Sequence, residues 1–500
     1  MLLIYPPISK PCEPPAGIAR LAGAIGKFPI SIVDTGLDAV LRSIHGQISD
    51  NDTWTHRSKK NLRSNLNYLR QNNRWEIDKY TRAVMDINRL LERSLYSMGV
   101  KATLGNYQDQ NLSPLRSSDL LKAAETPEKN PFYPFFKNWL SPQDDGLTGI
   151  SLNFLSQAIT AFAMIGYLKK QYPGTKIILG GGLITSWIKR QGWENPFTGL
   201  VDDMVAGPGE NFIRRLLDTG ESPGHVRPGY DLFPVNDYLS PGFILPYSAS
   251  SGCYWQKCRF CPEKAEGNTY IPISPEAVMD DLTSLIETHR PVMVHILDNA
   301  ISPSLLKRFT EQPLNVPWYG FVRITDHFKD PDFCIGLKKS GCVMLKIGVE
   351  SGDQGVLDAL DKGIDLKTAS LALRNLRNAG IGTYLYFLFG TPPEGPSEAG
   401  NTMEFVLKHH NMIDFMNLAI FNMPCNSPDA ERCNTHKFYE GDLSLYSSFE
   451  HPKGWNRRSV RAFLDNEFKK APGIRKIIKR TPPFFTSNHA AFFLKNNYPL

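Results

Sequence analysis

Apolar runs of strand length alternate with segments of helical spacing over most of the chain. At the N-terminus, "MLLIY" and "ISIVD" flank a helical repeat at residues 16–27, which predicts a strand, a helix and a second strand. The alternation resumes with "LTGISLNF", "KIILGGG" and "VDDMV", and a later series contains "VMVHILD", "WYGFVR", "MLKIGVE", "TYLYFLFG" and "MNLAIFN". Because strands that alternate with helices form parallel sheets, the pattern predicts two α/β domains.

The segment between the two halves of the first series has a different pattern. Residues 46–144 carry many polar positions at helical spacing and few β signals, which predicts a helical insertion. We therefore expect an α/β protein in which residues 1–45 and 145–225 form a Rossmann-like doubly wound domain. A linker at 226–245, a partial (β/α) TIM-type barrel at 246–440 and a small basic extension at 441–500 follow.

The composition indicates in which cellular location this protein is expected. The 500 residues are 41% hydrophobic and carry a net charge of +6, and no apolar run is long enough to cross a membrane or to act as a signal peptide. Eight cysteines in 500 residues do not form a disulfide framework, so we expect a reducing, cytoplasmic location. We expect Cys12, Cys334 and Cys342 in the core, and Cys425 and Cys433 as free thiols rather than ligands of a second cluster.

The last fifty residues are more basic than the rest of the chain. Residues 451–500 hold eleven Lys or Arg against Asp465 and Glu467, and aromatic residues lie among them. Such a segment can contact a nucleic acid or an acidic peptide, but a solvated helical face explains the same pattern and is the interpretation we favour.

Three cysteines lie together just after the first predicted barrel strand. Cys253, Cys258 and Cys261 have the spacing C-x4-C-x2-C, at the strand end where β/α barrels place their chemistry. A structural zinc site closes with four ligands, yet the next histidine is His289 and the next cysteine is Cys334. Three thiolates on a four-iron cube leave one iron open to a substrate or cofactor. A zinc knuckle with a distant fourth ligand is the alternative.

The cysteine loop resembles the cluster loop of the radical S-adenosylmethionine (radical SAM) enzymes. The usual family spacing is C-x3-C-x2-C, so this chain has one extra residue, and "GCYW" with "FC" is similar to the subset that carries an N-terminal cobalamin-binding domain. By this resemblance the three cysteines hold a 4Fe-4S cluster and SAM binds the open iron. The contacts to SAM implied by the matching motifs are Phe260, Asp298, Asn299, Arg323, Glu350 and Ser351.

The N-terminal half is similar to the cobalamin-binding domain of the same subset. "PPISKPCEPPAGIARLAGAI", "GISLNF", "LGGGLITSW" and "VAGPGE" occur in the order found there. The residues expected near cobalamin are Pro15, Ser151, Asn153, Gly180, Gly181, Gly182, Gly207 and Glu210. The D-x-H-x-x-G motif that gives many cobalamin proteins a lower axial histidine is not in the sequence, so the resemblance implies cobalt without that ligand.

The resemblance implies reductive cleavage of SAM to a 5'-deoxyadenosyl radical, and radical methylation of an unactivated carbon with cobalamin as the methyl carrier. It also implies an electron donor such as flavodoxin or ferredoxin. A radical rearrangement, cyclisation or oxidation without methyl transfer is one alternative. A nucleic-acid or peptide-binding protein with a structural metal loop is another. We further expect His489 in "TSNHAAFF" as a lid residue over the active site.

Overall fold

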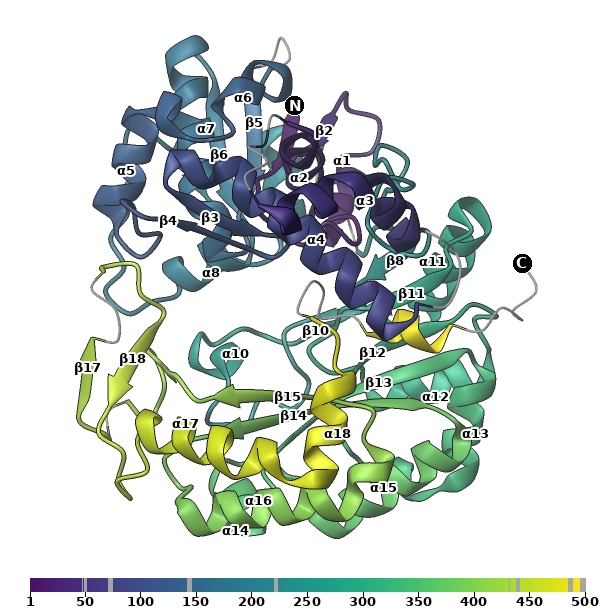
Figure 1. Ribbon diagram of the computed structural model, residues 1–500. Helices are drawn as coiled ribbons and strands as arrows, with labels where there is room; N and C mark the ends of the chain where they lie inside the picture. Colours follow the sequence, from purple (N-terminus) through teal and green to yellow (C-terminus); the bar gives the residue numbers. More distant parts are fainter. Residues whose placement is uncertain are drawn as a thin grey trace. The chain divides into compact units, whose positions relative to one another are not determined.

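The computed structural model divides into two compact units, which are described separately (Figure 1). The N-terminal unit is built on Met1–Pro246 and the barrel unit on Tyr247–Phe438 and Tyr446–Pro482, and short later segments complete each unit. The structure describes residues 1–46, 48, 52–70, 75–141, 146–219, 224–430, 432–437, 441–483 and 489–494.

The N-terminal unit contains a five-stranded parallel sheet with the order β2-β1-β5-β6-β7. The strands are β1 (Leu2–Tyr5), β2 (Ser31–Asp34), β5 (Leu147–Ser151), β6 (Lys176–Gly180) and β7 (Asp203–Met204). The connecting helices are α1 (Ala16–Ile25), α2 (Thr35–His45), α7 (Leu155–Gln171), α8 (Gly182–Ile188) and α9 (Glu210–Leu216). The chain leaves β1 for β2 on one side and returns to β5 on the other, so the strand order reverses between β1 and β5. This is the doubly wound arrangement expected from the sequence.

The insertion between β2 and β5 is mostly helical. It contains α3 (Thr53–Arg70), α4 (Ile77–Leu95), α5 (Ser117–Glu125) and α6 (Tyr133–Trp139), with the short 3-10 helices η1 (Tyr96–Met98) and η2 (Pro127–Lys129). An antiparallel hairpin of β3 (Val100–Thr103) and β4 (Asn106–Asp109) was not expected. Its strands have only four residues each and bury alternate side chains, a signal too short to stand out among helical repeats.

The barrel unit contains a six-stranded sheet with the order β15-β14-β13-β12-β11-β8. The strands are β8 (Ile244–Tyr247), β11 (Met293–Ile296), β12 (Trp318–Val322), β13 (Cys342–Glu350), β14 (Gly382–Phe389) and β15 (Phe415–Ile420). Successive strands of the chain are neighbours, and each pair from β11 to β15 is parallel. Because β8 and β15 are the two edges, the barrel is partial, as expected.

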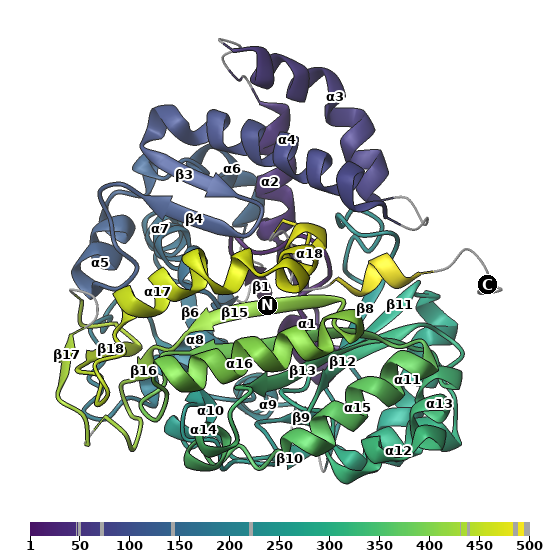
Figure 2. The same cartoon turned by 60° about the horizontal axis from the view of Figure 1, so that its bottom comes forward.

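The helices of the barrel unit follow their strands in turn (Figures 1 and 2). They are α11 (Pro275–His289), α12 (Pro303–Glu311), α13 (Pro331–Lys339), α14 (Gln354–Ala359), α15 (Leu366–Ala379) and α16 (Pro396–His409), with η3 (Asp326–Lys329) and η4 (His410–Met412). Local chemistry fixes their starts. The Ser274 hydroxyl accepts from the Ala277 N–H at 3.2 Å before α11, and the Asp365 carboxylate caps α15 in the same way at 2.8 Å.

The rest of the barrel unit is small strands and amphipathic helices. β9 (Ser250–Ser251) pairs with β10 (Ile271–Pro272), and β16 (Met423–Pro424), β17 (Thr435–Lys437) and β18 (Tyr446–Phe449) form a three-stranded sheet. α10 (Pro262–Ala265) follows the cysteines, and α17 (Arg457–Asn466), η5 (Phe468–Lys470), α18 (Pro472–Arg480) and η6 (Ala490–Phe493) complete the chain. In α17 and α18 the buried positions are apolar and most basic residues are exposed, which fits the solvated-face interpretation. Among the described residues, no helix has the length and apolar character needed to span a membrane.

Candidate functional site

The cysteine loop begins at the carboxyl end of β8. Gly252 has a φ of +73°, and a Cβ there would lie 2.6 Å from the Thr269 carbonyl oxygen, so the entry to the loop requires glycine. Cys253, Cys258 and Cys261 are all free and half-buried, and Cys261 immediately precedes α10. The backbone N–H of Arg259 donates to the Leu360 carbonyl at 3.0 Å, which ties the loop to the segment after α14.

The three thiols interact electrostatically with one another. Burial raises the pKa of Cys258, and the charge of Cys253 adds to this, whereas Lys362 and Arg323 oppose it. Burial likewise raises the pKa of Cys261 to about 11, with a further contribution from Cys258. Metal ligation requires thiolates, and the two neighbouring cations stabilise that form.

A single metal ion and an iron–sulfur cluster require different arrangements of the three thiols. Within the described part of the chain, no three His, Cys, Asp or Glu side chains gather around one point as ligands of a single metal ion do. The cysteines of an iron–sulfur cube each bind a different iron, so they need not converge on one point. The three cysteines stay the residues expected to hold a cluster.

A buried charged layer lies beside Cys258. The Arg323 side chain, 6% exposed after β12, places Nη1 3.8 Å from Cys258 Sγ and donates from Nη2 to the Lys362 carbonyl at 2.5 Å. Its guanidinium lies 4.0 Å from the ring centroid of Trp255, whose Nε1 donates to the Asp361 carbonyl at 2.9 Å. These contacts hold the Arg323 side chain against the cysteine loop.

Glu350 ends β13 in a strained conformation beside this layer. Its φ is +68°, and the register between β13 and β14 shifts between Gly348 and Glu350. Its carboxylate accepts a hydrogen bond from Lys362 Nζ at 2.9 Å, and both side chains are nearly buried. With Arg323, the pair leaves one net positive charge next to the thiols, which favours an anionic cluster.

Two of the residues expected at SAM hold the stem of the cysteine loop, and their contact with SAM stays a prediction. The buried Asp298 carboxylate accepts from the Ala249 N–H at 2.7 Å, from the Ser250 N–H at 3.3 Å and from Ser250 Oγ at 2.8 Å. Asn299 Nδ2 donates to the Gly252 carbonyl at 3.3 Å. These contacts occupy Asp298 with the loop itself, so its first role is to position the cysteines.

Ser351 forms local contacts at the end of β13. It is fully buried, with Oγ 3.2 Å from Thr402 Oγ1 of α16, and it accepts from the Asp353 N–H at 3.1 Å. Its contact with SAM stays a prediction. The Phe260 ring is half-buried with Lys362 Nζ 5.5 Å from its centroid, and its contact with adenine stays a prediction.

His489 also lies elsewhere than expected. It is 1% exposed, and its ring centroid lies 4.9 Å from those of Tyr384 and of Phe415. Both aromatic residues lie in the amino-terminal halves of their strands, whereas the cysteine loop follows the carboxyl end of its strand. His489 therefore packs at the opposite end of the barrel and is not a lid.

The residues expected near cobalamin gather at the carboxyl edge of the N-terminal sheet. Asn153 links the end of β5 to the start of α8 there, because its Nδ2 donates to Ser151 Oγ at 3.0 Å and its Oδ1 accepts from the Gly182 N–H at 2.9 Å. Pro15 precedes α1 at the same edge, after β1. In doubly wound sheets, ligands bind outside the carboxyl ends of the strands where the order reverses.

The glycines of this edge differ in what surrounds them. Gly181 has a φ of +105°, and a Cβ there would lie 2.5 Å from the Leu152 carbonyl oxygen, so its role is structural. Gly180 and Gly182 have ordinary space around them, and a Cβ at Gly207 would meet nothing within 4 Å. At these three positions, neighbouring atoms do not cover the side of the backbone where a side chain would lie.

Glu210 and Phe154 change the list of residues at this edge. Glu210 begins α9 and pairs with Arg20 of α1 at 2.5 Å, so it joins two helices. Phe154, next to Asn153, is 52% exposed and was not singled out from the sequence. An exposed aromatic side chain at a ligand crevice offers an apolar surface, and its position after the "GISLN" strand was the available signal.

The other cysteines lie outside this loop. Cys12, Cys334 and Cys342 are buried, as expected, and Cys425 and Cys433 are half-buried. That Cys425 and Cys433 hold no second cluster stays a prediction. Sequence reasoning missed two contacts to the cysteine loop, Trp255 with Arg323 and Arg259 with Asp429, and the nearby ion pair of Lys362 with Glu350. Each joins positions whose separation along the chain carries no pattern.

Comparison with known proteins agrees with this geometry. Residues 247–406 match the family model of the radical SAM superfamily. An uncharacterised methyltransferase of Pyrococcus horikoshii is 26% identical over 307 residues, which cover 53% of this chain and 64% of the relative. A bacteriochlorophyllide d C-12(1)-methyltransferase of Chlorobaculum tepidum is 24% identical over 180 residues, 34% of this chain and 39% of the relative. Both matches span less than two thirds of the relatives' lengths.

The fold extends the likeness to both units. The radical SAM methyltransferase TsrM from Kitasatospora setae, solved with cobalamin and a 4Fe-4S cluster, aligns with a TM-score of 0.51 and 15% identity. The alignment covers 86% of this chain and 78% of TsrM. Enzymes of the radical SAM superfamily use a 4Fe-4S cluster and SAM, and the matched region contains the three cysteines expected to hold such a cluster. Residues 247–406 of the chain are therefore similar to the radical SAM superfamily of enzymes.

Proposed function

We propose that this protein is a cobalamin-dependent radical SAM enzyme that methylates an unactivated carbon. The observation that carries the proposal is the combination, in one chain, of a three-cysteine loop at a barrel strand end and a doubly wound sheet with an open, glycine-containing carboxyl edge. The methyltransferases among its relatives support the same reaction. The anaerobic magnesium-protoporphyrin IX monomethyl ester cyclase of Rubrivivax gelatinosus, 26% identical over 187 residues, 36% of this chain and 32% of that relative, keeps the alternative open.

In the barrel unit, the residues bind and orient the cofactors. Cys253, Cys258 and Cys261 hold three irons and leave the fourth to SAM, while Asp298 fixes the stem of their loop. Arg323 and Lys362 provide the positive charge that favours thiolates and an anionic cluster. Cluster and SAM together supply the one-electron cleavage that gives methionine and the 5'-deoxyadenosyl radical.

In the N-terminal unit, the carboxyl edge offers backbone and an aromatic face to cobalamin. Gly182 and Gly207 leave room for close approach, Asn153 and Ser151 offer polar groups, and Phe154 offers an apolar face. Cobalamin supplies the methyl carrier. The sequence has no D-x-H-x-x-G motif, so this chain would hold cobalamin without a histidine from that motif.

The products separate the proposal from its alternatives. The chain is reconstituted anaerobically with iron, sulfide and cobalamin, reduced in the presence of SAM, and analysed by mass spectrometry. Methylation forms S-adenosylhomocysteine and 5'-deoxyadenosine, because one SAM gives the methyl group and another gives the radical. A rearrangement, cyclisation or oxidation forms 5'-deoxyadenosine alone.

Cys258→Ala is the control for this experiment. If this variant forms no 5'-deoxyadenosine, then SAM cleavage in the wild-type protein depends on the cysteine loop. A colourless protein with one zinc and no SAM cleavage would overturn the proposal in favour of a nucleic-acid or peptide-binding protein with a structural metal. To test for a protein electron donor, flavodoxin or ferredoxin replaces the chemical reductant in the same assay.

A further inference from the structure

Two cations approach the indole of Trp255, which lies in the cysteine loop. The Arg323 guanidinium carbon is 4.0 Å from the centroid of the ring, and Lys257 Nζ is 4.9 Å from it. The Nε1–H of the indole donates to the Asp361 carbonyl at 2.9 Å, which fixes the plane of the ring. Because an aromatic face attracts a buried cation more strongly than an exposed one, the contact with Arg323 is the stronger of the two.

The backbone around this indole is adapted to its position. Gln256, the next residue, has a φ of +52°, which is uncommon for a residue other than glycine. Gly363 has a φ of +65°, and a Cβ there would lie 2.2 Å from Trp255 Cζ2, so only glycine leaves room for the ring. Strained residues of the first kind occur most often at functional sites. The ring therefore has a fixed place against the segment after α14.

Arg323 extends from this indole to Cys258. Its Nη1 lies 3.8 Å from Cys258 Sγ, and its Nη2 donates to the carbonyls of Lys362 and Gly363 at 2.5 and 3.5 Å. The Tyr254 hydroxyl is a further partner, and burial raises its pKa to about 12, so it is neutral. Within the described part of the chain, no carboxylate forms an ion pair with this guanidinium, so its buried charge acts on the thiol without a counter-ion.

A charge at this place affects the two oxidation states of an iron–sulfur cluster differently. Reduction adds an electron to a centre that thiolates already make anionic, so a nearby cation stabilises the reduced state more than the oxidised one. Hydrogen bonds to the sulfur atoms also set the reduction potential. Loss of this cation should therefore make the cluster harder to reduce, and the proposed cleavage of SAM begins from the reduced state.

We propose that Trp255 is a positioning residue, which holds Arg323 beside Cys258 and thereby raises the reduction potential of the cluster. The inference rests on the proposed function, because it takes the three cysteines to hold that cluster. It assigns to Trp255 a role that neither cluster ligation nor SAM binding requires. Since the ring acts through Arg323, its effect should disappear when the guanidinium is removed.

Redox titration of the full, cluster-loaded chain without SAM tests the proposal. Titanium(III) citrate is the reductant, and the EPR signal of the reduced cluster is the readout. Arg323→Gln removes the charge and keeps an amide donor, and it should lower the ratio of reduced to oxidised cluster about tenfold, equivalent to about 59 mV in midpoint potential. Trp255→Leu should lower the ratio in the same direction, and Trp255→Phe, which keeps an aromatic face, should stay close to wild type. In the Arg323→Gln protein, Trp255→Leu should have no further effect.

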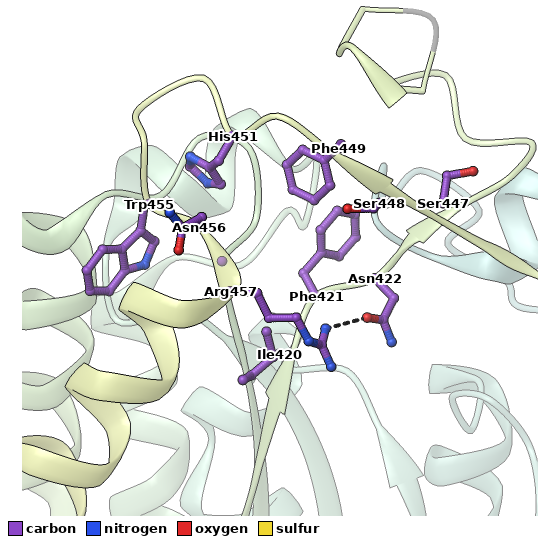
Figure 3. Close-up of a pocket in the computed structure, with 11 residues that line it drawn as sticks. Ile420, Phe421, Asn422, Ser447, Ser448, Phe449, His451, Trp455, Asn456 and Arg457 are labelled. Atoms are coloured by element: carbon purple, nitrogen blue, oxygen red, sulfur yellow. Dashed lines mark hydrogen bonds between the residues drawn. The ribbon is translucent and has the colours of Figure 1, made fainter. Parts of the chain in front are cut away.

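Two variants control for the loss of a cation as such. Lys257→Gln removes the exposed cation at the same indole, where water screens its charge. Arg457→Gln makes the same change as Arg323→Gln at a half-buried guanidinium, which donates to Asn422 Oδ1 at 2.6 Å (Figure 3). Of the described residues that line the pocket around Arg457, none belongs to the cysteine loop. Both controls should change the ratio less than about twofold.

Three results would overturn the assignment. These are a wild-type ratio in an Arg323→Gln protein that carries full iron, an equal effect of Trp255→Leu with and without Arg323, or an equal effect in either control. If Arg323→Gln loads no cluster, the comparison of Trp255→Leu with Trp255→Phe decides, and equal ratios in these two variants would overturn the role of the ring.

Failure of the proposed function gives a different result. A wild-type chain that loads no cluster would overturn the proposed function and this inference together. A cluster that shows the expected shifts in a chain that forms no S-adenosylhomocysteine would refute methyl transfer and keep the role of Trp255.

Discussion

At the residue scale, Glu394 shows how burial sets the protonation of one side chain at the barrel face. Burial raises its pKa from the ordinary value to about 7, against two hydrogen bonds from Gly390 and Trp455, and the charges of Glu398 and Asp353 raise it further. The native protein therefore holds a proton that the unfolded chain releases between about pH 4.5 and pH 7. Stability falls as the pH rises through this window.

Glu394→Gln should remove that pH dependence. Because the wild-type carboxyl loses about 2–3 kcal/mol of native stabilisation across the window, the variant should melt several degrees higher relative to wild type at pH 8 than at pH 5. Thermal unfolding at the two pH values measures the difference. Glu404→Gln makes the same change at an exposed position of α16 and should show no such difference. Equal shifts at both pH values would contradict the ionisation argument.

The residues of the cluster site were predictable only where they share a short motif. Cys253, Cys258 and Cys261 lie within nine positions, and their spacing points to a cluster without any structure. Lys362 lies twelve positions from Glu350, and Arg323 lies 65 positions from Cys258, so nothing in their spacing predicts their contacts. Asp298 was placed at the correct strand end, but its three hydrogen bonds to the cysteine loop follow from the fold and not from the motif.

At the scale of elements, the cysteine loop depends on a distant turn. Arg259 lies between two of the cysteines and forms an ion pair with Asp429, with Nε 3.4 Å from Oδ2, and the Asp429 side chain is only 10% exposed. Asp429 lies in the turn after β16, where its N–H donates to Ser427 Oγ at 3.2 Å and its carbonyl accepts from Cys433 at 3.0 Å. This turn therefore helps to hold the loop in shape.

Asp429→Asn should loosen the loop while the fold remains. We expect a stability loss of about 1–3 kcal/mol and a several-fold faster loss of iron to a chelator, followed by absorbance of the cluster. Asp465→Asn breaks an exposed helical pair with Lys469, 2.6 Å long, and should leave the rate of iron loss unchanged. Similar rates in the two variants would show that the turn does not support the loop.

Elements were easier to predict than their contacts. The barrel strands are apolar runs of four to nine residues bounded by polar or glycine-containing turns, and β13 is buried along eight of its nine positions, so the strands stand out in the sequence. The β3–β4 hairpin was not predicted because its strands are short. The His489 segment failed for another reason, since a single histidine between aromatic residues does not reveal which end of a barrel it packs against.

At the scale of the whole molecule, the two expected cofactor sites lie in separate compact units with separate cores. The five-stranded sheet lies in the N-terminal unit and strands β11 to β15 lie in the barrel unit, and the residues expected to hold each cofactor come from one unit alone. A change at one site that respects its local fold should therefore leave the other site loaded.

Two variants test this independence in opposite directions. Cys258→Ala should lose the cluster, measured as iron per chain, and still bind cobalamin with the wild-type spectrum and affinity. Gly182→Leu places a bulky side chain where the only atoms near the added Cβ belong to Asn153, at 3.7 Å or more, so the sheet should tolerate it. Since that side chain would fill the crevice, cobalamin affinity should fall at least tenfold while iron content stays the same.

Gly174→Leu is the matched control for the crevice. Gly174 precedes β6 at the amino edge of the same sheet and also has open space around it, so this variant should bind both cofactors normally. If Gly174→Leu and Gly182→Leu reduced cobalamin binding equally, the effect would come from the sheet as a whole and the crevice assignment would be wrong. If Gly182→Leu bound cobalamin as wild type does, the proposal that cobalamin binds at this carboxyl edge would be wrong. The similarity of the barrel to radical SAM enzymes would not be affected.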